Sequence, residues 1–567
     1  MSEINKENIY NVDSQIPASE FEFAHKDESI HDTKFETRPI GWLEDSVRRF
    51  AKNKASVAAF IILVLIGLFS IIVPIASPMT YVSKADFPSG FKVKEYAYAL
   101  PRLSSTGPKL GFWDGTKSAT IGEADYRLHA YNDSNDDFYV GQTETIVTKI
   151  PGQTIYNYKV QVDTYAIGTR LITISAEEYQ SLVEYENEKG ISYSASPENA
   201  RKSIIKPYVD YEGYINGKLD AWLDAEGADS TKKYTIKDSI AKAYNQNQFV
   251  YYELVPSKAR NGTLSDTQFV PNEVLDENRN IITPASDIYA RDGENLKFYK
   301  ITSGGAYEVR VDFYDYFTFR YGFEPNYVFG ANQYGEDIFL RIALGARFSL
   351  LLGIAISFIN FIIGLIYGSI AGYYGGKVDL IMERVTDIIA NVPTIIIMTI
   401  AQIQLVNNLQ LKSVLGTTGT LIAAILIAFI YSGWIGTAST TRMQFYRYKG
   451  QEYVLASRTL GARDSRLIFK HILPNAAGTL VTSSVLMVPG VIFSETSLSY
   501  LGIIDFSTSG ICSIGAMLNE GQAANISMNP HVLLFPAIII SLLMICFNLF
   551  GNGLRDAFNT TLRGSED

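Results

Sequence analysis

The chain has 567 residues, of which 47% are hydrophobic, and a formal net charge of −10 at pH 7. This length excludes a single ordinary domain, and only two cysteines argue against a disulfide framework. A mean hydropathy near zero conceals two regimes, because apolar residues are concentrated in a few blocks while residues 79–328 are polar, acidic and rich in tyrosine. We therefore predict a membrane protein that also carries a water-soluble part.

The first apolar block lies in residues 42–78, which we predict to form one transmembrane helix with a basic flank. Residues 55–77 carry no charge, and this length crosses a hydrocarbon core of about 30 Å at about 1.5 Å per residue. The hydrophilic residues 1–41 precede the block, which is unlike a secretory signal. Its N-terminal side is basic, with Arg48, Arg49, Lys52 and Lys54. The positive-inside tendency therefore predicts that residues 1–41 form a cytoplasmic tail.

Residues 79–328 then lie outside the cytoplasm, and their patterns predict an inserted α+β domain. Apolar and polar residues alternate as in strands over 138–150 and 156–175. Residues 174–190 have a capping box and helical character. The tyrosines of this domain have two interpretations: they form a surface that contacts peptides, or they pair across strands.

Residues 329–563 contain the other five apolar blocks and form the predicted membrane core. The blocks are 349–373, 388–406, 415–436, 477–501 and 531–549. Six spans return the C-terminal tail, 564–567, to the cytoplasm and place the loop 437–475 there as well. That loop has seven basic residues against two acidic ones, which is the bias expected of a short cytoplasmic loop.

Small and ionisable residues within these blocks predict packing and interior sites. Gly364, Gly368 and Gly372 recur every four residues, a spacing that lets another helix approach closely. Charged groups in spans are costly and usually face an interior. Glu495 and Ser499 are candidates for the translocation path or its gate, together with Asp387. The alternative for Glu495 is a structural role in which it is paired.

In the stretch from Glu452 to Asn475, a glycine and a proline interrupt two short helical patterns. A helix from Glu452 meets Gly461, which favours the left-handed conformation that ends helices. Asp464 or Ser465 is suited to cap a second short helix, and Pro474 predicts a break before the next span. This pattern predicts a helix, a turn and another helix that project into the cytoplasm and dock in a groove.

This stretch resembles the EAA loop of bacterial ABC importer permeases. Gly461, Leu473 and Pro474 fall on the family spacing, while Leu455, Ala456 and Ser457 occupy the Glu-Ala-Ala positions and His471 replaces an isoleucine. Residues 329–350 resemble the segment that precedes the second span in C-type oligopeptide and dipeptide permeases (OppC/DppC type). Ala331, Asn332 and Glu336 depart from that pattern. Similar stretches are 371–379, 495–502, 515–521 and 547–563, so the resemblance covers about residues 42–78 and 329–563.

The resemblance implies the six-helix type I ABC importer permease fold and a peptide importer as the function. It implies a second homologous permease, two ABC ATPases, an extracytoplasmic binding lipoprotein, a peptide substrate and membrane lipid as partners, and no nucleic acid. The coupling residues would lie in 452–475: Glu452, Leu455, Ala456, Ser457, Gly461, Ala462, Asp464, His471 and Pro474. ATP and Mg would be held by the ATPases, since this chain has no phosphate-binding GxxxxGK[ST] loop.

No catalytic residues, bound cofactor or metal site are predicted for this chain, because its five histidines are scattered. The expected location is the bacterial cell membrane, as a multi-pass protein with both termini cytoplasmic. Within the same family, nickel, glutathione or another small solute remain alternative substrates. A membrane-anchored receptor or adhesion protein is the alternative from a different class.

Overall fold

The computed structural model describes residues 42–78, 94–105, 113–122, 126, 139–150, 153–193, 199, 202–209, 220–245, 253–258, 261–272, 289–506 and 509–558. The predicted tails, 1–41 and 564–567, lie outside the described residues. The helices are α1 (Trp42–Lys52), α2 (Lys54–Ala76), η2 (Lys94–Tyr96), α5 (Ala176–Lys189), α8 (Asp220–Ala225), α9 (Ser230–Asn245), α10 (Phe313–Tyr321), α11 (Ile338–Tyr374), α12 (Gly376–Ala390), α13 (Thr394–Ala401), η5 (Gln402–Val406), α14 (Leu409–Gly433), α15 (Ile435–Lys449), α16 (Glu452–Thr459), α17 (Asp464–Arg466), η6 (Leu467–Ile472), α18 (Leu473–Tyr500), α19 (Ile514–Ala523) and α20 (Pro530–Phe558).

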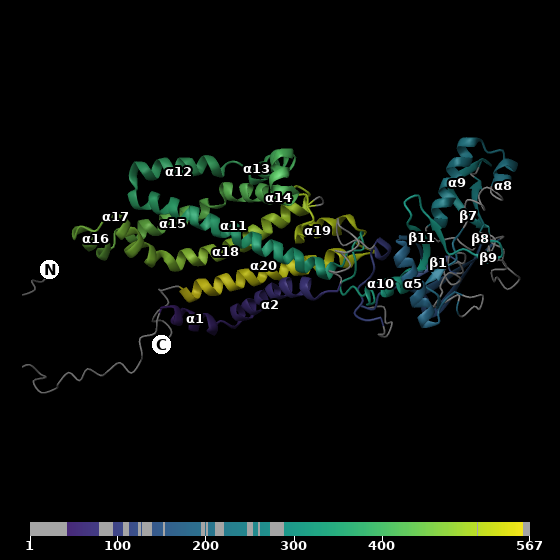
Figure 1. Cartoon of the computed structure of the whole chain (residues 1–567). Helices are drawn as coiled ribbons and strands as arrows, with labels where there is room; N and C mark the ends of the chain where they lie inside the picture. The colour runs from purple at the N-terminus through teal and green to yellow at the C-terminus, as the bar shows by residue number, and fades with distance from the viewer. Residues whose placement is uncertain are drawn as a thin grey trace, which may run out of the picture.

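The molecule is elongated, with a bundle of long helices at one end and a mixed region of strands and helices at the other (Figure 1). Within the described residues, five helical stretches are long and apolar enough to cross a membrane: Lys54–Ala76, Ile338–Tyr374, Leu409–Lys449, Asp464–Tyr500 and Pro530–Phe558. α1, α16 and the C-terminal end of α20 lie at the end of the bundle opposite the strands. The chain is therefore a multi-pass membrane protein.

The predicted third span, 388–406, is not one straight helix. α12 and the α13–η5 segment are bent by 66° relative to each other, so a count of six holds only if this pair is taken as one span. The break falls at Asn391 and Pro393, where α12 ends and α13 begins. Proline has no N–H and disfavours a helical conformation in the residue before it, which explains why the helix stops here.

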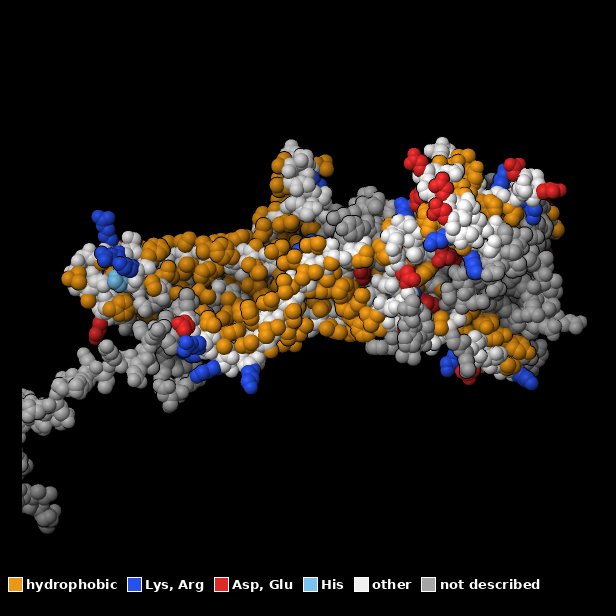
Figure 2. Space-filling model, turned by 60° about the horizontal axis from the view of Figure 1, so that its bottom comes forward, with side chains coloured by type: hydrophobic (Ala, Val, Ile, Leu, Met, Phe, Trp, Pro, Cys, Tyr) orange, Lys and Arg blue, Asp and Glu red, His pale blue; other side chains and the backbone are white. Residues whose placement is uncertain are grey.

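The side chains on the bundle surface are mainly apolar. Figure 2 shows a nearly continuous hydrophobic surface over the bundle, with lysine and arginine gathered at the end that carries the α16 projection. Ile61, Leu65 and Ile72 of α2 and Leu351 and Phe358 of α11 are all exposed. Such a belt suits hydrocarbon, whereas a water-soluble protein seldom exposes apolar patches of this extent.

The stripe of Gly364, Gly368 and Gly372 faces α15. A Cβ at Gly364 would lie 2.6 Å from Cβ of Thr437, and one at Gly372 would lie 2.8 Å from the carbonyl oxygen of Arg442. A Cβ at Gly368 would overlap the carbonyl oxygen of Ala438. Small residues at these three positions let the two backbones come together, and they join α11 to the helix that leads into α16.

We expect Gly368→Ala to lower the free energy of unfolding by about 1–3 kcal/mol, the usual cost of overpacking a close contact. The matched control is Gly67→Ala in α2, where nothing lies within 4 Å of the added Cβ. The control should leave stability unchanged or raise it slightly, since alanine is the better helix former. Thermal unfolding of both purified variants checks this, and equal stability would contradict the tight packing of α11 on α15.

Between α2 and α11 the described chain forms both strands and helices. The strands are β1 (Thr116–Gly122), β2 (Tyr139–Ile150), β3 (Gln153–Asp163), β4 (Thr169–Ile174), β5 (Ile205–Lys206), β6 (Glu253–Lys258), β7 (Leu264–Asn272), β8 (Arg291–Asp292), β9 (Asn295–Leu296), β10 (Tyr299–Ile301) and β11 (Tyr307–Asp312). One sheet has the order β1-β3-β2 and another the order β10-β11-β4, with β5 also paired to β11. Ser175 is the N-cap of α5, and its side chain accepts a hydrogen bond from the N–H of Glu178, as the capping box predicts.

Tyrosines fill the core of this region. Tyr96 is fully buried, and its ring lies 5.7 to 5.9 Å from those of Tyr165, Phe313, Phe317 and Tyr327. On the sheet, Tyr299 and Tyr307 of the neighbouring strands β10 and β11 stack with ring centroids 4.5 Å apart. These described tyrosines pack against one another. Of the two interpretations, this favours tyrosines that pair across strands over a surface that contacts peptides.

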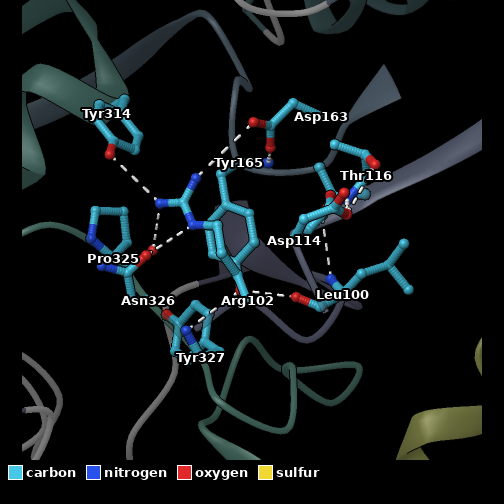
Figure 3. Close-up of polar contacts among 12 residues, drawn as sticks. Leu100, Arg102, Asp114, Thr116, Asp163, Tyr165, Tyr314, Pro325, Asn326 and Tyr327 are labelled. Atoms are coloured by element: carbon cyan, nitrogen blue, oxygen red, sulfur yellow. Dashed lines mark hydrogen bonds and ion pairs between the residues drawn. The ribbon is translucent and has the colours of Figure 1, made fainter. Parts of the chain in front are cut away.

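Buried Arg102 connects the strands of this region to the segment between α10 and α11 (Figure 3). Its guanidinium donates to Asn326 Oδ1 at 2.7 Å and to the carbonyl oxygen of Pro325 at 2.7 Å. It also lies 3.7 Å from the ring centroid of Tyr165 and 3.9 Å from Asp163 Oδ2. Burial raises the pKa of the Tyr165 hydroxyl, which stays protonated and donates to the carbonyl oxygen of Leu100.

The two ends of the region are hydrogen-bonded to each other beside the bundle. The N–H of Tyr98 donates to the carbonyl oxygen of Asn332, and the N–H of Ala331 donates to that of Ala99. The indole of Trp113 donates to the carbonyl oxygen of Val328 at 2.5 Å, and its ring lies 5.6 Å from that of Phe535 in α20. The region is thus attached through several paired segments rather than through two loose linkers.

Candidate coupling segment and interior carboxylate

The segment 452–475 forms a projection at the end of the bundle remote from the strands (Figure 1). Gly461 has φ +83°, in the left-handed region. The N–H of Ala462 donates to the carbonyl oxygen of Ser457 and that of Gly461 donates to Arg458. These two bonds complete the motif that ends helices at a left-handed glycine. The prediction that Gly461 ends the first helix is confirmed.

The prediction that Pro474 breaks the second helix is wrong, and so is the predicted cap. α17, η6 and α18 form one continuous helical stretch from Asp464 to Tyr500. Pro474 lies in the first turn of α18, directly after the π-helical turn η6. The wider turn accommodates a proline that cannot donate a hydrogen bond. The residue before α17 is Arg463, without a side-chain cap, while Asp464 and Ser465 belong to the helix.

The projection is held on the bundle by an apolar cluster and by polar bonds. Phe445, Val454, Leu467 and Ile472 are fully buried together beside Tyr373 of α11. The Tyr373 hydroxyl donates to Asp464 Oδ1 at 2.5 Å and accepts from Arg458 at 3.3 Å. Lys449 donates to the carbonyl oxygen of Gly372 at 2.9 Å. A force on α16 therefore acts on α11, α15 and α18 together.

The outer face of the projection presents apolar side chains to solvent. Leu460 is 88% exposed and Phe469 is 68% exposed, and Leu455 and Tyr453 are also exposed. Glu452, Ala456, Gly461 and Asp464 are exposed as well, whereas Ser457, Ala462 and His471 are half-buried. The segment thus exposes two large apolar side chains and two arginines, Arg463 and Arg466, which a groove in a partner can bind.

Glu495 lies in the interior, bound by hydroxyl groups from three helices. It is 1% exposed. Ser513 donates to Oε1 at 2.6 Å and Ser499 donates to the same oxygen at 3.0 Å, while Ser349 donates to Oε2 at 3.2 Å. These residues come from α11, α18 and the N-cap of α19. This geometry favours the structural role for Glu495, because its oxygens already join three elements.

Asp387 is separate from this group. It pairs with Arg384 on α12 at 2.9 Å, and both side chains are more than half exposed. Nearby, Arg442 of α15 makes a two-bond contact with Asp379 at 2.5 and 2.6 Å and approaches Glu383 at 3.3 Å. The three residues predicted for the translocation path therefore lie at two separate places. Glu495 and Ser499 are buried together, whereas Asp387 is in an exposed ion pair.

We expect Glu495→Ala to lower the free energy of unfolding by about 1–3 kcal/mol, since three buried hydroxyls lose their common acceptor. Glu495→Gln keeps an acceptor oxygen, so it should lower the free energy of unfolding by less. Glu188→Ala, at an exposed position of α5, is the control and should have little effect. Thermal unfolding measures the three variants. A fully stable Glu495→Ala protein that has lost uptake would instead support the path role.

A second buried polar network joins α11 to α19 at the joint. Arg341 donates to both oxygens of Glu520, at 2.5 and 2.8 Å, and lies 2.9 Å from Glu336 Oε2. Asn332 donates to Glu336 at 2.7 Å and to Glu520 at 2.9 Å. Ala331, Asn332 and Glu336 are the positions that depart from the C-type pattern. Asn332 and Glu336 belong to this network, and Ala331 is hydrogen-bonded to Ala99.

Comparisons with known proteins identify the membrane part. The family described as "N-terminal TM domain of oligopeptide transport permease C" matches residues 41–91, and "Binding-protein-dependent transport system inner membrane component" matches residues 364–564. The oligopeptide transport system permease protein OppC of Bacillus subtilis is 41% identical over 235 residues, which are 41% of this chain and 72% of that protein. The chain belongs to the OppC/DppC family of permeases.

Other members are similar over comparable lengths. The dipeptide transport system permease protein DppC of Bacillus subtilis is 37% identical over 41% of this chain and 69% of that protein. The glutathione transport system permease protein GsiD of Pectobacterium atrosepticum is 31% identical over 44% of this chain and 78% of that protein. This OppC/DppC-type permease is thus a transport component, with a type I ABC importer permease domain.

Sequence reasoning missed several residues of these sites. Tyr373 and Lys449 hold the projection, and nothing in their local sequence indicates a partner about 90 or 77 positions away. Glu520 lies in a recognised stretch, 515–521, but its bond to Arg341 spans 179 residues. Charge close to an apolar block is the one sequence signal that could have indicated Lys449 and Glu520.

Proposed function

We propose that the chain is a transmembrane permease subunit of an ABC importer that moves oligopeptides or dipeptides into a bacterial cell. The observation that carries the proposal is the match to oligopeptide and dipeptide permeases at 37–41% identity over about 70% of their length. The exposed projection at 452–475 supports it, because a receptor or adhesion protein has no evident need for such a docking element.

In this proposal the projection binds a groove of a cytoplasmic ATPase. Leu460 and Phe469 insert as apolar anchors, and Arg463 and Arg466 contact the rim. ATP-driven closure of two ATPases moves the projection, and the rigid contacts of Tyr373 and Lys449 transmit the movement to α11. A packed element with few internal degrees of freedom transmits displacement, as in other rigid-body transitions.

The remaining partners are a second, homologous permease that encloses the pathway and an extracytoplasmic lipoprotein that delivers peptide. ATP and Mg are bound by the ATPases. The termini of the chain are cytoplasmic in this arrangement, and residues 79–328 form an extracytoplasmic domain inserted between the first two spans.

Reconstitution tests the proposal. The chain is co-expressed with the proposed partner permease, ATPases and binding protein. The complex is then purified and placed in liposomes. Labelled di- and oligopeptides should accumulate only with ATP and the binding protein. A complex that assembles but takes up no peptide would reject peptide import as its function.

Glutathione is the second candidate substrate, because GsiD of Pectobacterium atrosepticum is 31% identical over 78% of its length. The same liposomes distinguish the two candidates. Uptake of labelled glutathione that unlabelled tri-alanine does not inhibit would favour it. Nickel is tested in parallel with radioactive nickel.

The extracytoplasmic domain is proposed to help dock the binding protein, since its joint lies at the bundle end where peptide would enter. Deleting residues 85–325 should reduce binding-protein association while the ATPases still co-purify. Retention of the ATPases is the control for assembly. Unchanged binding-protein affinity would reject the docking role.

A further inference from the structure

A pocket of about 720 Å³ lies in the strand-containing region, and the transport machinery described above does not use it. Its walls are residues 208–209 and most of the stretch between Ala290 and Ile301. The β8–β9 hairpin, which contributes to it, lies at the end of the molecule away from the bundle (Figure 1). Pockets that bind small ligands have volumes of about 300–1,000 Å³, so the size suits a short peptide.

The walls of the pocket are held by main-chain hydrogen bonds. The N–H of Tyr208 donates to the carbonyl oxygen of Lys297, and the N–H of Lys297 donates to that of Ala290, each at 2.8 Å. The Tyr208 hydroxyl donates to Glu308 of β11 at 2.8 Å. Tyr299 is fixed by its stacking on Tyr307. A site built in this way is formed before a ligand arrives, which lowers the entropic cost of binding.

One wall is the strand β10, which is the terminal strand in the order of its described sheet. All three of its residues are exposed, and Ile301 is 58% exposed. A terminal strand offers backbone N–H and C=O groups on its outer side, and an extended peptide can add to it as a further strand. Such pairing tolerates many side chains, as a carrier of varied peptides requires.

Charge and size select among possible occupants. Among the described residues of the lining, Lys297 and Lys300 stand against one acidic residue, Asp292, so these charged groups favour an anionic group such as a terminal carboxylate. Eleven of the described residues line it, whereas stable protein interfaces use about 20–30 residues a side. These features favour a short peptide over a folded partner.

We infer that this pocket binds the C-terminal residues of a short extended peptide, with the carboxylate beside Lys297 and Lys300 and the main chain along β10. The inference rests on the proposed function, in that peptides are the transported class. It adds a peptide site on the permease itself, distinct from the membrane pathway and from the delivering binding protein.

Fluorescence anisotropy of the full-length chain in lipid nanodiscs, without other subunits, tests the inference. The probe is penta-alanine with an N-terminal fluorescein and a free C-terminal carboxylate, compared with the same peptide as its C-terminal amide. Lys297→Glu reverses a charge in the pocket. Lys117→Glu, at an exposed lysine of β1 in the same region, is the matched control.

The expected result is saturable binding of the carboxylate peptide and weaker binding of the amide. Lys297→Glu should lower the affinity for the carboxylate peptide by roughly five- to tenfold, and Lys117→Glu should leave that affinity unchanged. Thermal unfolding of both variants verifies that the fold is retained. Absence of saturable binding, or equal affinity in the two variants, overturns the inference.

Two further outcomes separate this inference from the proposed function. If the wild-type chain binds the partner lipoprotein through this pocket but not penta-alanine, the pocket is a docking surface and the inference fails. If ATP-driven peptide uptake persists while the isolated chain binds no peptide, the inference fails and the importer stands. If the pocket binds peptide but the complete complex takes up none, the importer fails instead.

Discussion

Replacing Leu460 with aspartate is expected to reduce ATP-driven peptide uptake by about 30-fold or more while the protein remains folded. Leu460 is 88% exposed at the tip of the projection, so the free subunit loses little packing. In the proposed complex the same side chain is an anchor in a groove, and losing such an anchor costs about 2 kcal/mol or more. A buried carboxylate without a partner adds a further penalty.

The measurements are co-purification with the ATPases and uptake into liposomes, with thermal unfolding as the check on folding. Leu103→Asp is the matched control, since Leu103 is 63% exposed in the strand-containing region. It should leave both assembly and uptake intact. Phe469→Ala, which truncates the second exposed anchor, should weaken assembly in the same direction. Normal uptake by a Leu460→Asp complex would contradict the coupling role of the projection.

Arg341→Met is expected to produce the largest loss of stability, about 3–5 kcal/mol in the free energy of unfolding. Arg341 is 6% exposed, and its guanidinium contacts the carboxylates of Glu336 and Glu520. Methionine has a similar length but leaves two neighbouring carboxylates without their cation. Breaking a buried pair costs far more than the pair contributes, because the remaining charge is not solvated.

Two controls make the Arg341 result specific. Arg48→Met breaks an exposed pair with Glu44 in α1 and should cost less than about 1 kcal/mol. The triple variant Arg341→Met, Glu336→Gln, Glu520→Gln removes all three charges and should recover much of the loss. If the triple variant is as unstable as Arg341→Met alone, the shape of the arginine rather than its charge is what stabilises the joint.

The strand-containing region illustrates how far local patterns reach. Alternation over 138–150 and 156–175 predicted strands, and β2, β3 and β4 lie there. The capping box at Ser175 predicted the start of α5. The order of strands and the burial of Tyr96 among four aromatic rings did not follow from these patterns, because they depend on segments far apart in the chain. β4 pairs with β11, and Tyr96 packs on Phe317 and Tyr327.

The sequence by itself determined five of the six predicted apolar spans, the left-handed turn at Gly461 and the family to which the chain belongs. These are properties of contiguous residues, since hydropathy and backbone preference act over one helix or one turn. Only the tertiary structure decided that α12 and α13 are bent apart, that the helix continues through Pro474, and that Glu495 and Arg341 have partners on distant helices. The cost of burying a charge or bending a helix depends on the groups packed against it, and those groups lie far away in the sequence.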